Sequence, residues 1–172
     1  CDSIPKPISY INPNLDKKAA FHAMLDTKRP KIGLVWQGNK EYLGDKRRSI
    51  DPTLFACLSE FDAQFVSLQK ELDEPAFKIV QASLDIVDMH DMLHDFDDTA
   101  ALIDELDFVV SIDTSVAHLV ATMGKTTIIL LPFAPDWRWG TSGETTPWYE
   151  SAYLARQKSP SDWESALTQA VR

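Results

Sequence analysis

The chain has 172 residues, enough for one domain with a substantial hydrophobic core. Its formal net charge of −9 argues against a general binder of nucleic acid or anionic membranes, because both tasks need a broad basic surface. No apolar run in the sequence is long enough to cross a bilayer, and no signal-peptide pattern opens it. The two cysteines form no disulfide framework, so we expect a cytoplasmic protein.

Residues 1–30 are expected to form a connector followed by a short helix. Pro5, Pro7 and Pro13 are typical of an extended connector, and a helix is predicted over residues 15–25. The sequence starts at Cys1 rather than Met, so we expect a piece of a longer protein or a processed chain.

Apolar runs alternate with helical patterns from residue 31 onward. Runs this apolar are typical of strands that are covered on both faces, and therefore of a parallel sheet. Strands are predicted over residues 31–36, 64–68, 86–89, 108–112, 126–131 and 152–156. Helices are predicted from residue 52 and over residues 75–82, 100–106, 117–123 and 163–171. This order predicts one α/β domain over residues 31–172, with a doubly wound, mostly parallel, Rossmann-like sheet.

Several of these helices carry capping residues in the sequence. Asp51 before Pro52 and Asp162 before the last helix are typical N-caps. Residues 97–99 are predicted to cap the helix over residues 100–106, and Gly124 is predicted to end the next one.

The segment Ser-Ile-Asp-Thr-Ser-Val-Ala-His, residues 111–118, is the strongest candidate for a ligand site. A strand that turns here straight into a helix leaves free N–H groups at the helix start, and these attract anions, phosphates above all. Thr114 and Ser115 could cap the helix and also offer hydroxyls to a phosphate, and His118 falls one turn further on. The alternative is an ordinary capped helix with a core histidine, which the spacing alone favours.

A run of cations follows the first predicted strand. Lys46, Arg47 and Arg48 are consecutive, and the fixed fork of donors in an arginine suits a diphosphate or a sugar acid. Without other information, a solvated basic loop is the more frequent explanation of such a run.

Two more segments follow predicted strands, at the side where open parallel sheets bind ligands. Gln69 and Lys70 stand at the end of the second strand. Residues 132–149, after the fifth strand, are rich in tryptophan and proline. Aromatic loops of this kind either fold back onto the core or line a ligand cleft.

Common nucleotide-binding and hydrolase motifs are missing from the sequence. It contains no dinucleotide glycine fingerprint, no Walker sequence and no Gly-x-Ser-x-Gly elbow. No cluster of His, Cys and Asp has the spacing of metal ligands. We therefore expect neither a cofactor nor a metal.

Several of these segments together resemble one group of proteins. They are residues 33–39, 45–50, 65–70, 95–102, 111–119, 135–139 and 147–149. The chain from residue 31 to its C-terminus resembles the C-terminal half of glycosyltransferase family 9-like proteins, which are related to heptosyltransferases and are often found with tetratricopeptide repeats. It departs from the usual pattern of that group at Lys40, Gly44 and Lys46, where the group commonly has Pro, Asn and Arg.

The resemblance implies the donor-binding lobe of a GT-B glycosyltransferase, in which two Rossmann-like lobes face a cleft. It implies inverting, metal-independent transfer of a hexosyl or heptosyl group from a nucleotide diphosphate sugar to a carbohydrate or protein acceptor. The catalytic base is expected in an N-terminal lobe, and an N-terminal lobe or a repeat domain of the same protein is the expected partner. We therefore expect this chain alone to bind the donor but to turn over poorly or not at all, without nucleic acid or membrane partners.

The resemblance assigns the donor diphosphate to the turn in residues 113–118. Thr114, Ser115 and His118 would contact phosphate. Asp113 would fix the turn or contact the sugar.

Two other loops are assigned to the same ligand. By resemblance, Gly38, Asn39 and Arg48 would line the cleft near the diphosphate. Gln69 and Lys70 would lie towards the nucleoside or the phosphate.

Three other functions stay open at this point. The chain could be an inactive module that binds a nucleotide sugar, or a protein-interaction module whose aromatic loop, residues 137–149, docks a partner. Sugar epimerisation is the third, for which Glu41, Glu71 and Glu144 are the loop acids that the sequence offers.

Overall fold

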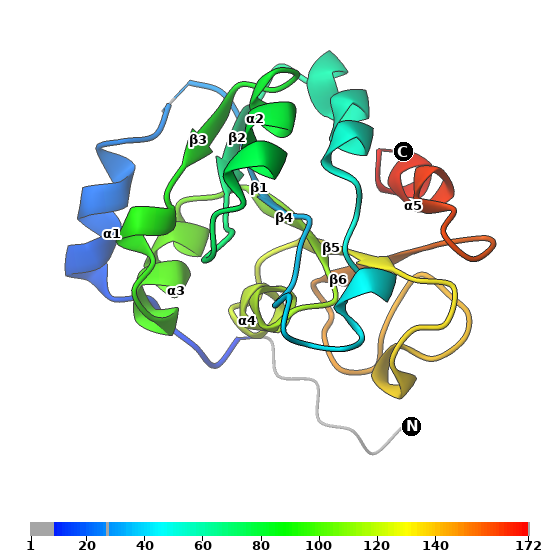
Figure 1. The fold of residues 1–172 in the computed structure, drawn as a ribbon. Coiled ribbons are helices and arrows are strands. Elements are labelled where there is room, and N and C mark those ends of the chain that lie inside the picture. The colour runs from blue at the N-terminus through cyan, green and yellow to red at the C-terminus, as the bar shows by residue number, and fades with distance from the viewer. Residues whose placement is uncertain (1–8, 27, 172) are drawn as a thin grey trace.

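The computed structural model describes residues 9–26 and 28–171, so most of the predicted connector lies outside the described residues. Six strands form one sheet in the order β3-β2-β1-β4-β5-β6 (Figure 1). They are β1 Lys31–Val35, β2 Gln64–Ser67, β3 Ile86–Asp88, β4 Phe108–Ile112, β5 Thr127–Leu131 and β6 Ala152–Arg156. Every pairing in this sheet is parallel, so the predicted Rossmann-like fold is confirmed.

The strands form where the sequence is continuously apolar, because both faces of the sheet are covered. Leu34 in β1, Val109 in β4 and Ile129 in β5 are fully buried. Gly33 lies in β1 where an added Cβ would stand 2.8 Å from the side chains of Leu68 and Leu106, so the neighbouring layers approach closely there.

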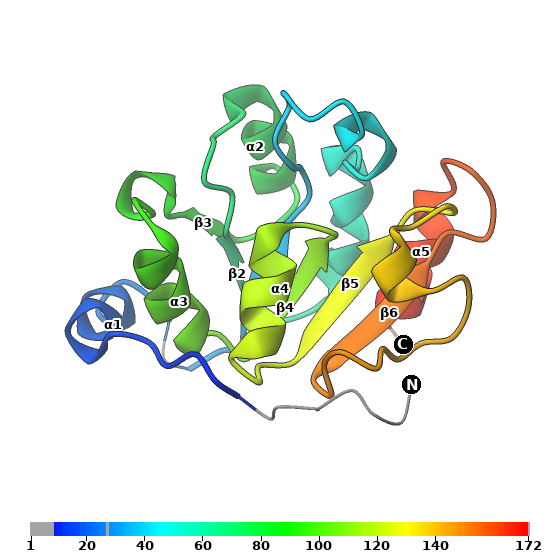
Figure 2. The same ribbon diagram turned by 90° about the horizontal axis from the view of Figure 1, so that it is seen from below.

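Helices cover the two faces of the sheet in two groups. They are α1 Leu15–His22, α2 Glu74–Gln81, α3 Phe96–Asp104, α4 Ser115–Thr122, α5 Trp163–Ala170 and the 3-10 helix η2 Pro52–Glu60. Helices α1, α3 and α4 pack together on one face, whereas α2, η2 and α5 pack on the other (Figures 1 and 2).

Local capping explains most of the helix ends, and it corrects one prediction. Helix α3 begins four residues earlier than predicted, because Asp95 is its N-cap and forms a capping box with Asp98. The prediction that residues 97–99 cap this helix was therefore wrong. Asp51 and Asp162 are the N-caps that the sequence indicates, and Gly124 follows α4 with a φ of 73°.

Ion pairs hold helix α1 against α3. The Nζ of Lys17 lies 2.6 Å from Asp98 and 3.0 Å from Asp97, and Lys18 pairs with Asp104. Phe21 on the same helix is buried in the main core. The helix before β1 thus packs against the domain that follows it.

The strand order fixes where a ligand would bind. β1 lies between β2 and β4, so the connections after β1 and β4 leave the sheet in opposite directions. In open α/β sheets, the crevice between two such neighbouring strands, at their carboxyl ends, is the usual ligand site. None of the helices in residues 9–26 and 28–171 is long and apolar enough to traverse a bilayer.

Candidate functional site

Two adjoining cavities open at the carboxyl ends of β1 and β4. The smaller has a volume of ≈ 200 Å³ and the larger of ≈ 620 Å³, and they share Arg48, Thr114 and Ser115. The other predicted site residues divide between them. Gly38, Asn39, Gln69 and Lys70 line the smaller cavity, and Asp113 and His118 line the larger one. The fold thus brings all the predicted site residues into one continuous region.

The N-terminus of helix α4 forms the wall between the two cavities. Thr114 occupies its N-cap position with an extended backbone, yet no side chain caps the helix. The hydroxyl of Thr114 lies 3.3 Å from that of Ser111 instead, so the prediction of a Thr114 or Ser115 cap was wrong. The other α-helices of the described residues are capped by the side chains of Asn14, Asp73, Asp95 and Asp162. The amides that start α4 therefore face the cavities with the positive end of the helix dipole.

Arg48 is held in place by three groups. Its Nε donates to Asp45 Oδ1 at 3.0 Å, and its Nη1 donates to the backbone oxygen of Asp113 at 2.8 Å. Its guanidinium also stands over the ring of Tyr42, 4.9 Å from the centroid. A cation fixed in this way lines both cavities without needing to reorganise when an anion arrives.

Gly38 leaves the space that this ion pair occupies. A Cβ at position 38 would stand 2.2 Å from Asp45 Oδ1 and 2.5 Å from Arg48 Nη2. Only a residue without a side chain allows the Asp45–Arg48 pair to approach the backbone there.

His118 projects from the first turn of α4 into an aromatic cluster. Its Nδ1 lies 2.9 Å from the hydroxyl of Tyr149, and its ring stacks on Trp139 at 5.1 Å. Its Nε2 lies 3.8 Å from Asp113 Oδ1. Burial lowers the pKa of the imidazole, and the carboxylate of Asp113 acts in the opposite direction. Burial is the larger influence, which favours a neutral ring at pH 7.

The polar residues of the smaller cavity are partly engaged with the backbone. The Oε1 of Gln69 accepts from the amides of Trp36 and Gln37 at 3.0 and 3.2 Å, so this side chain braces the end of β1. The Nζ of Lys70 donates to the backbone oxygen of His94, and Asn39 accepts from the amide of Glu41.

Some residues of the larger cavity were not singled out by sequence reasoning. Tyr42 and Arg138 line it together with the predicted residues and with Arg47, which the sequence indicated only as part of the basic run. Arg138 belongs to the aromatic loop, which carried no assignment for this side chain, and Tyr42 lies in neither the basic run nor the aromatic loop.

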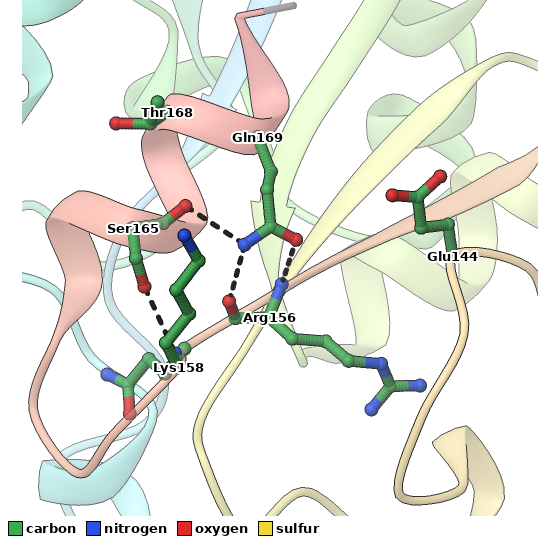
Figure 3. A pocket seen from close by; sticks show the side chains of 7 residues that line it. Glu144, Arg156, Lys158, Ser165, Thr168 and Gln169 are labelled. Carbon is green, nitrogen blue, oxygen red and sulfur yellow. Dashed lines mark hydrogen bonds between the residues drawn. The ribbon is translucent and has the colours of Figure 1, made fainter.

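Two of the three acids considered for epimerisation lie in different cavities. Glu71 lines the smaller cavity, whereas Glu144 lines a different cavity of ≈ 440 Å³ between β6 and α5. Figure 3 shows that cavity, in which the side chain of Gln169 forms hydrogen bonds with the backbone of Arg156. The guanidinium of Arg156 donates to the carbonyl oxygens of Trp139, Gly140, Ser142 and Gly143, so it holds the aromatic loop onto β6.

No group of three or more His, Cys, Asp or Glu side chains is placed to hold a metal ion among the residues that the structure describes.

The solved structures that share this fold include three glycosyltransferases. The E. coli ADP-heptose LPS heptosyltransferase II is 17% identical, with a TM-score of 0.66 over 98% of this chain and 55% of that protein. A family 9 glycosyl transferase from Veillonella parvula is 11% identical, with a TM-score of 0.63 over 94% of this chain and 46% of that one. The E. coli heptosyltransferase WaaC with ADP-2-deoxy-2-fluoro heptose is 16% identical, with a TM-score of 0.54 over 90% of this chain and 46% of that one.

The chain thus spans about half the length of the solved structures that it matches. No family model matches the sequence, and no curated protein matches it. The chain has the six-stranded, all-parallel Rossmann-like fold of a GT-B-type lobe, as found in about half of a heptosyltransferase.

Proposed function

We propose that this chain is the donor-binding domain of a glycosyltransferase that uses a nucleotide diphosphate sugar. The observation that carries the proposal is the uncapped N-terminus of α4, which lies between two cavities beside Arg48 and His118. Arg47, Arg48 and Arg138 line the larger cavity, although the chain as a whole carries a net charge of −9. The three similar structures, all named as glycosyl- or heptosyltransferases, support this choice among the functions of Rossmann-like folds.

The proposal assigns the diphosphate to the start of α4. The backbone amides there and the hydroxyls of Thr114 and Ser115 would hold one phosphate group, and Arg48 and His118 would approach from either side. Asp113 would stabilise the conformation of the turn or contact the sugar.

The remaining predicted site residues complete the assignment. Gly38 and Asn39 would line the cleft near the diphosphate. Gln69 and Lys70 would lie towards the nucleoside or the phosphate, at the end of β2.

The proposed reaction breaks the bond between the sugar anomeric carbon and the diphosphate oxygen. The acceptor oxygen forms its bond to the same carbon from the opposite face, which inverts the configuration. The leaving nucleoside diphosphate gains negative charge, and the helix amides, Arg48 and His118 would stabilise that charge without a metal. A general base must take the proton of the acceptor hydroxyl.

We assign that base, and the acceptor site, to another part of the protein. This chain spans about half the length of the glycosyltransferases that it resembles, and it contains one Rossmann-like sheet in its described residues. We therefore propose that this chain by itself binds the donor, and that it transfers sugar only together with an N-terminal lobe or repeat domain. We also propose that it acts in the cytoplasm. Robust glycosyl transfer by the isolated chain would refute this division.

Calorimetric titration of UDP and ADP into the chain tests the proposal. One nucleotide is expected to bind, and His118→Ala is expected to weaken binding at least about tenfold, about 1.4 kcal/mol. His90→Ala is the matched control, because its side chain has the same 29% exposure and lines neither cavity. If neither nucleotide binds this chain or the full-length protein, the proposal is wrong and an interaction module becomes the better explanation.

A further inference from the structure

The imidazole of His118 is held in one plane by an aromatic ring. It stacks on Trp139 with the ring centroids 5.1 Å apart and the planes 20° from parallel. Trp139 itself is only 3% exposed, so it offers a rigid surface. Stacking restricts the plane of the imidazole, but a half-turn about its Cβ–Cγ bond would leave the stacking intact. Something else must therefore select one of the two ring orientations.

Tyr149 makes that selection. Its hydroxyl lies 2.9 Å from Nδ1 of His118, a contact that a half-turn of the ring would replace with a carbon atom. The two rings also meet edge to face, 5.8 Å apart. With Nδ1 turned towards Tyr149, Nε2 faces Asp113 Oδ1 at 3.8 Å, in the larger cavity.

These contacts also determine which nitrogen carries the proton. Burial lowers the pKa of His118, so the neutral ring has one N–H group at pH 7. The carboxylate of Asp113 only accepts hydrogen bonds and would repel a lone pair on Nε2, which favours the tautomer with its proton on Nε2. Burial raises the pKa of Tyr149, so its hydroxyl keeps its proton and is able to donate to an Nδ1 that carries none.

We propose that Tyr149 is a positioning residue, which fixes the orientation and tautomer of His118 so that Nε2–H points into the anion-binding cavity. The inference rests on the proposed function to the extent that the anion is a diphosphate. It gives the aromatic loop a role in the site: Tyr149 and Trp139 set the direction of a hydrogen-bond donor. The neighbouring charges are Asp113, Asp136 and Arg138, which line the same cavity as His118.

The first test uses no ligand. Nitrogen-15 NMR of the histidine rings reports which nitrogen carries the proton, and the His118 signals are those that His118→Gln removes. The wild-type chain should show the Nε2–H tautomer at pH 7.5, and Tyr149→Phe should produce a mixture of tautomers. Tyr153→Phe is the control, because Tyr153 is 52% exposed on β6. An Nδ1–H tautomer in the wild-type chain would overturn the inference, even if the Phe variant failed to fold.

The second test measures binding of pyrophosphate by calorimetry. Tyr149→Phe should weaken binding about fivefold, the loss expected for one misdirected hydrogen bond. His118→Gln keeps an N–H near the position of Nε2 and should bind better than His118→Asn, whose amide lies near the position of Nδ1. In the His118→Gln background, Tyr149→Phe should cause no further loss, because the two residues act through one contact.

The binding results separate the role of Tyr149 from the proposed function. An equal loss from Tyr149→Phe in both backgrounds would show that Tyr149 acts only on the loop, and would overturn the inference. Unchanged binding in the wild-type background would do the same. If the wild-type chain bound no pyrophosphate and no nucleotide, the proposed function would fail, whereas the tautomer measurement would still decide the relationship between Tyr149 and His118.

Discussion

Arg48 and Asp113 lie 65 positions apart in the sequence, and the Nη1 of Arg48 donates to the backbone oxygen of Asp113 at 2.8 Å. This contact ties the loop after β1 to the turn after β4. Asp45 and the ring of Tyr42 also hold Arg48, so the protein's own side chains position the link between the two loops. Arg48 therefore joins the two loops that border the cavities.

Arg48→Lys should damage the site although the charge is kept. A lysine ammonium cannot reach Asp45 and the Asp113 carbonyl with the fork geometry of a guanidinium. We expect nucleotide binding to weaken about tenfold and the free energy of unfolding to fall by about 1–2 kcal/mol. Calorimetry and urea unfolding measure the two effects, with the exposed Lys46→Ala as control. Equal losses in both variants would contradict a specific role for Arg48.

Gly38→Ala should disturb the same ion pair from the backbone side. The new Cβ would overlap Asp45 and Arg48, which must move apart, at a cost of about 2 kcal/mol in the free energy of unfolding. Gly143→Ala is a useful comparison, because a Cβ there would meet no neighbouring atom. Its loss of stability would come only from the backbone φ of +87°, which alanine rarely adopts. Both variants should lose stability, but Gly38→Ala alone should lose nucleotide affinity. A Gly38→Ala chain as stable as the wild type would count against tight packing of Asp45 and Arg48 on the backbone of Gly38.

Thr114→Asp should trade ligand binding for stability. A carboxylate at the N-cap position would accept from the free amides of α4, raising the free energy of unfolding by about 1 kcal/mol. The same negative charge would repel a phosphate, so nucleotide binding should fall at least about tenfold. Thermal unfolding and calorimetry on one preparation would measure both effects. Retained affinity in this variant would mean that the anion binds elsewhere.

The pH dependence of stability should reveal His118. Its native pKa is lowered from the ordinary value of about 6.5, so the native state binds fewer protons than the unfolded chain. Its contribution to stability is therefore complete above pH 6.5 and is lost as the pH falls through the lower native pKa. Urea unfolding at pH 7.5 and 5.5 should show a smaller loss for His118→Gln than for the wild type. The exposed His94→Gln controls for the removal of one histidine, and identical losses in all three chains would contradict the prediction.

Arg156→Gln should loosen the aromatic loop. The variant loses charged hydrogen bonds to the carbonyl oxygens of Trp139 and of Gly140, among others. We expect faster proteolysis within residues 140–144 and a nucleotide affinity lowered about threefold to tenfold, because Trp139 supports His118. Limited proteolysis followed by mass spectrometry locates the cleavage. Thr168→Ala, on the far side of the cavity in Figure 3, is the control.

The sheet was predictable because its signal is local. Each predicted strand agrees with the observed one to within about one residue at either end, since continuous apolar runs in β1 and β5 must be buried on both faces. The start of α3 was misplaced because Asp95, Asp97 and Asp98 are all good N-caps in isolation. Only the reciprocal bonds of Asp95 and Asp98 decide between them.

The contents of the candidate site were only partly predictable. The turn at residues 111–118 indicates an anion site by its residue types, but the missing cap on α4 depends on the contact between Thr114 and Ser111. Two contacts in the site join segments that are distant in the sequence, Arg48 to the carbonyl oxygen of Asp113 and His118 to the hydroxyl of Tyr149, so no local pattern predicts either contact.

The all-parallel order of the strands separates the requirements for folding from those for binding. The core residues lie mostly within the strands and the helices that cover them, whereas the cavities are lined mainly by residues that follow the carboxyl ends of β1, β2, β4 and β5. Loops of this kind can change in length and chemistry without repacking the sheet. A chain only 11–17% identical to other proteins can therefore keep their architecture while its recognition surface diverges independently.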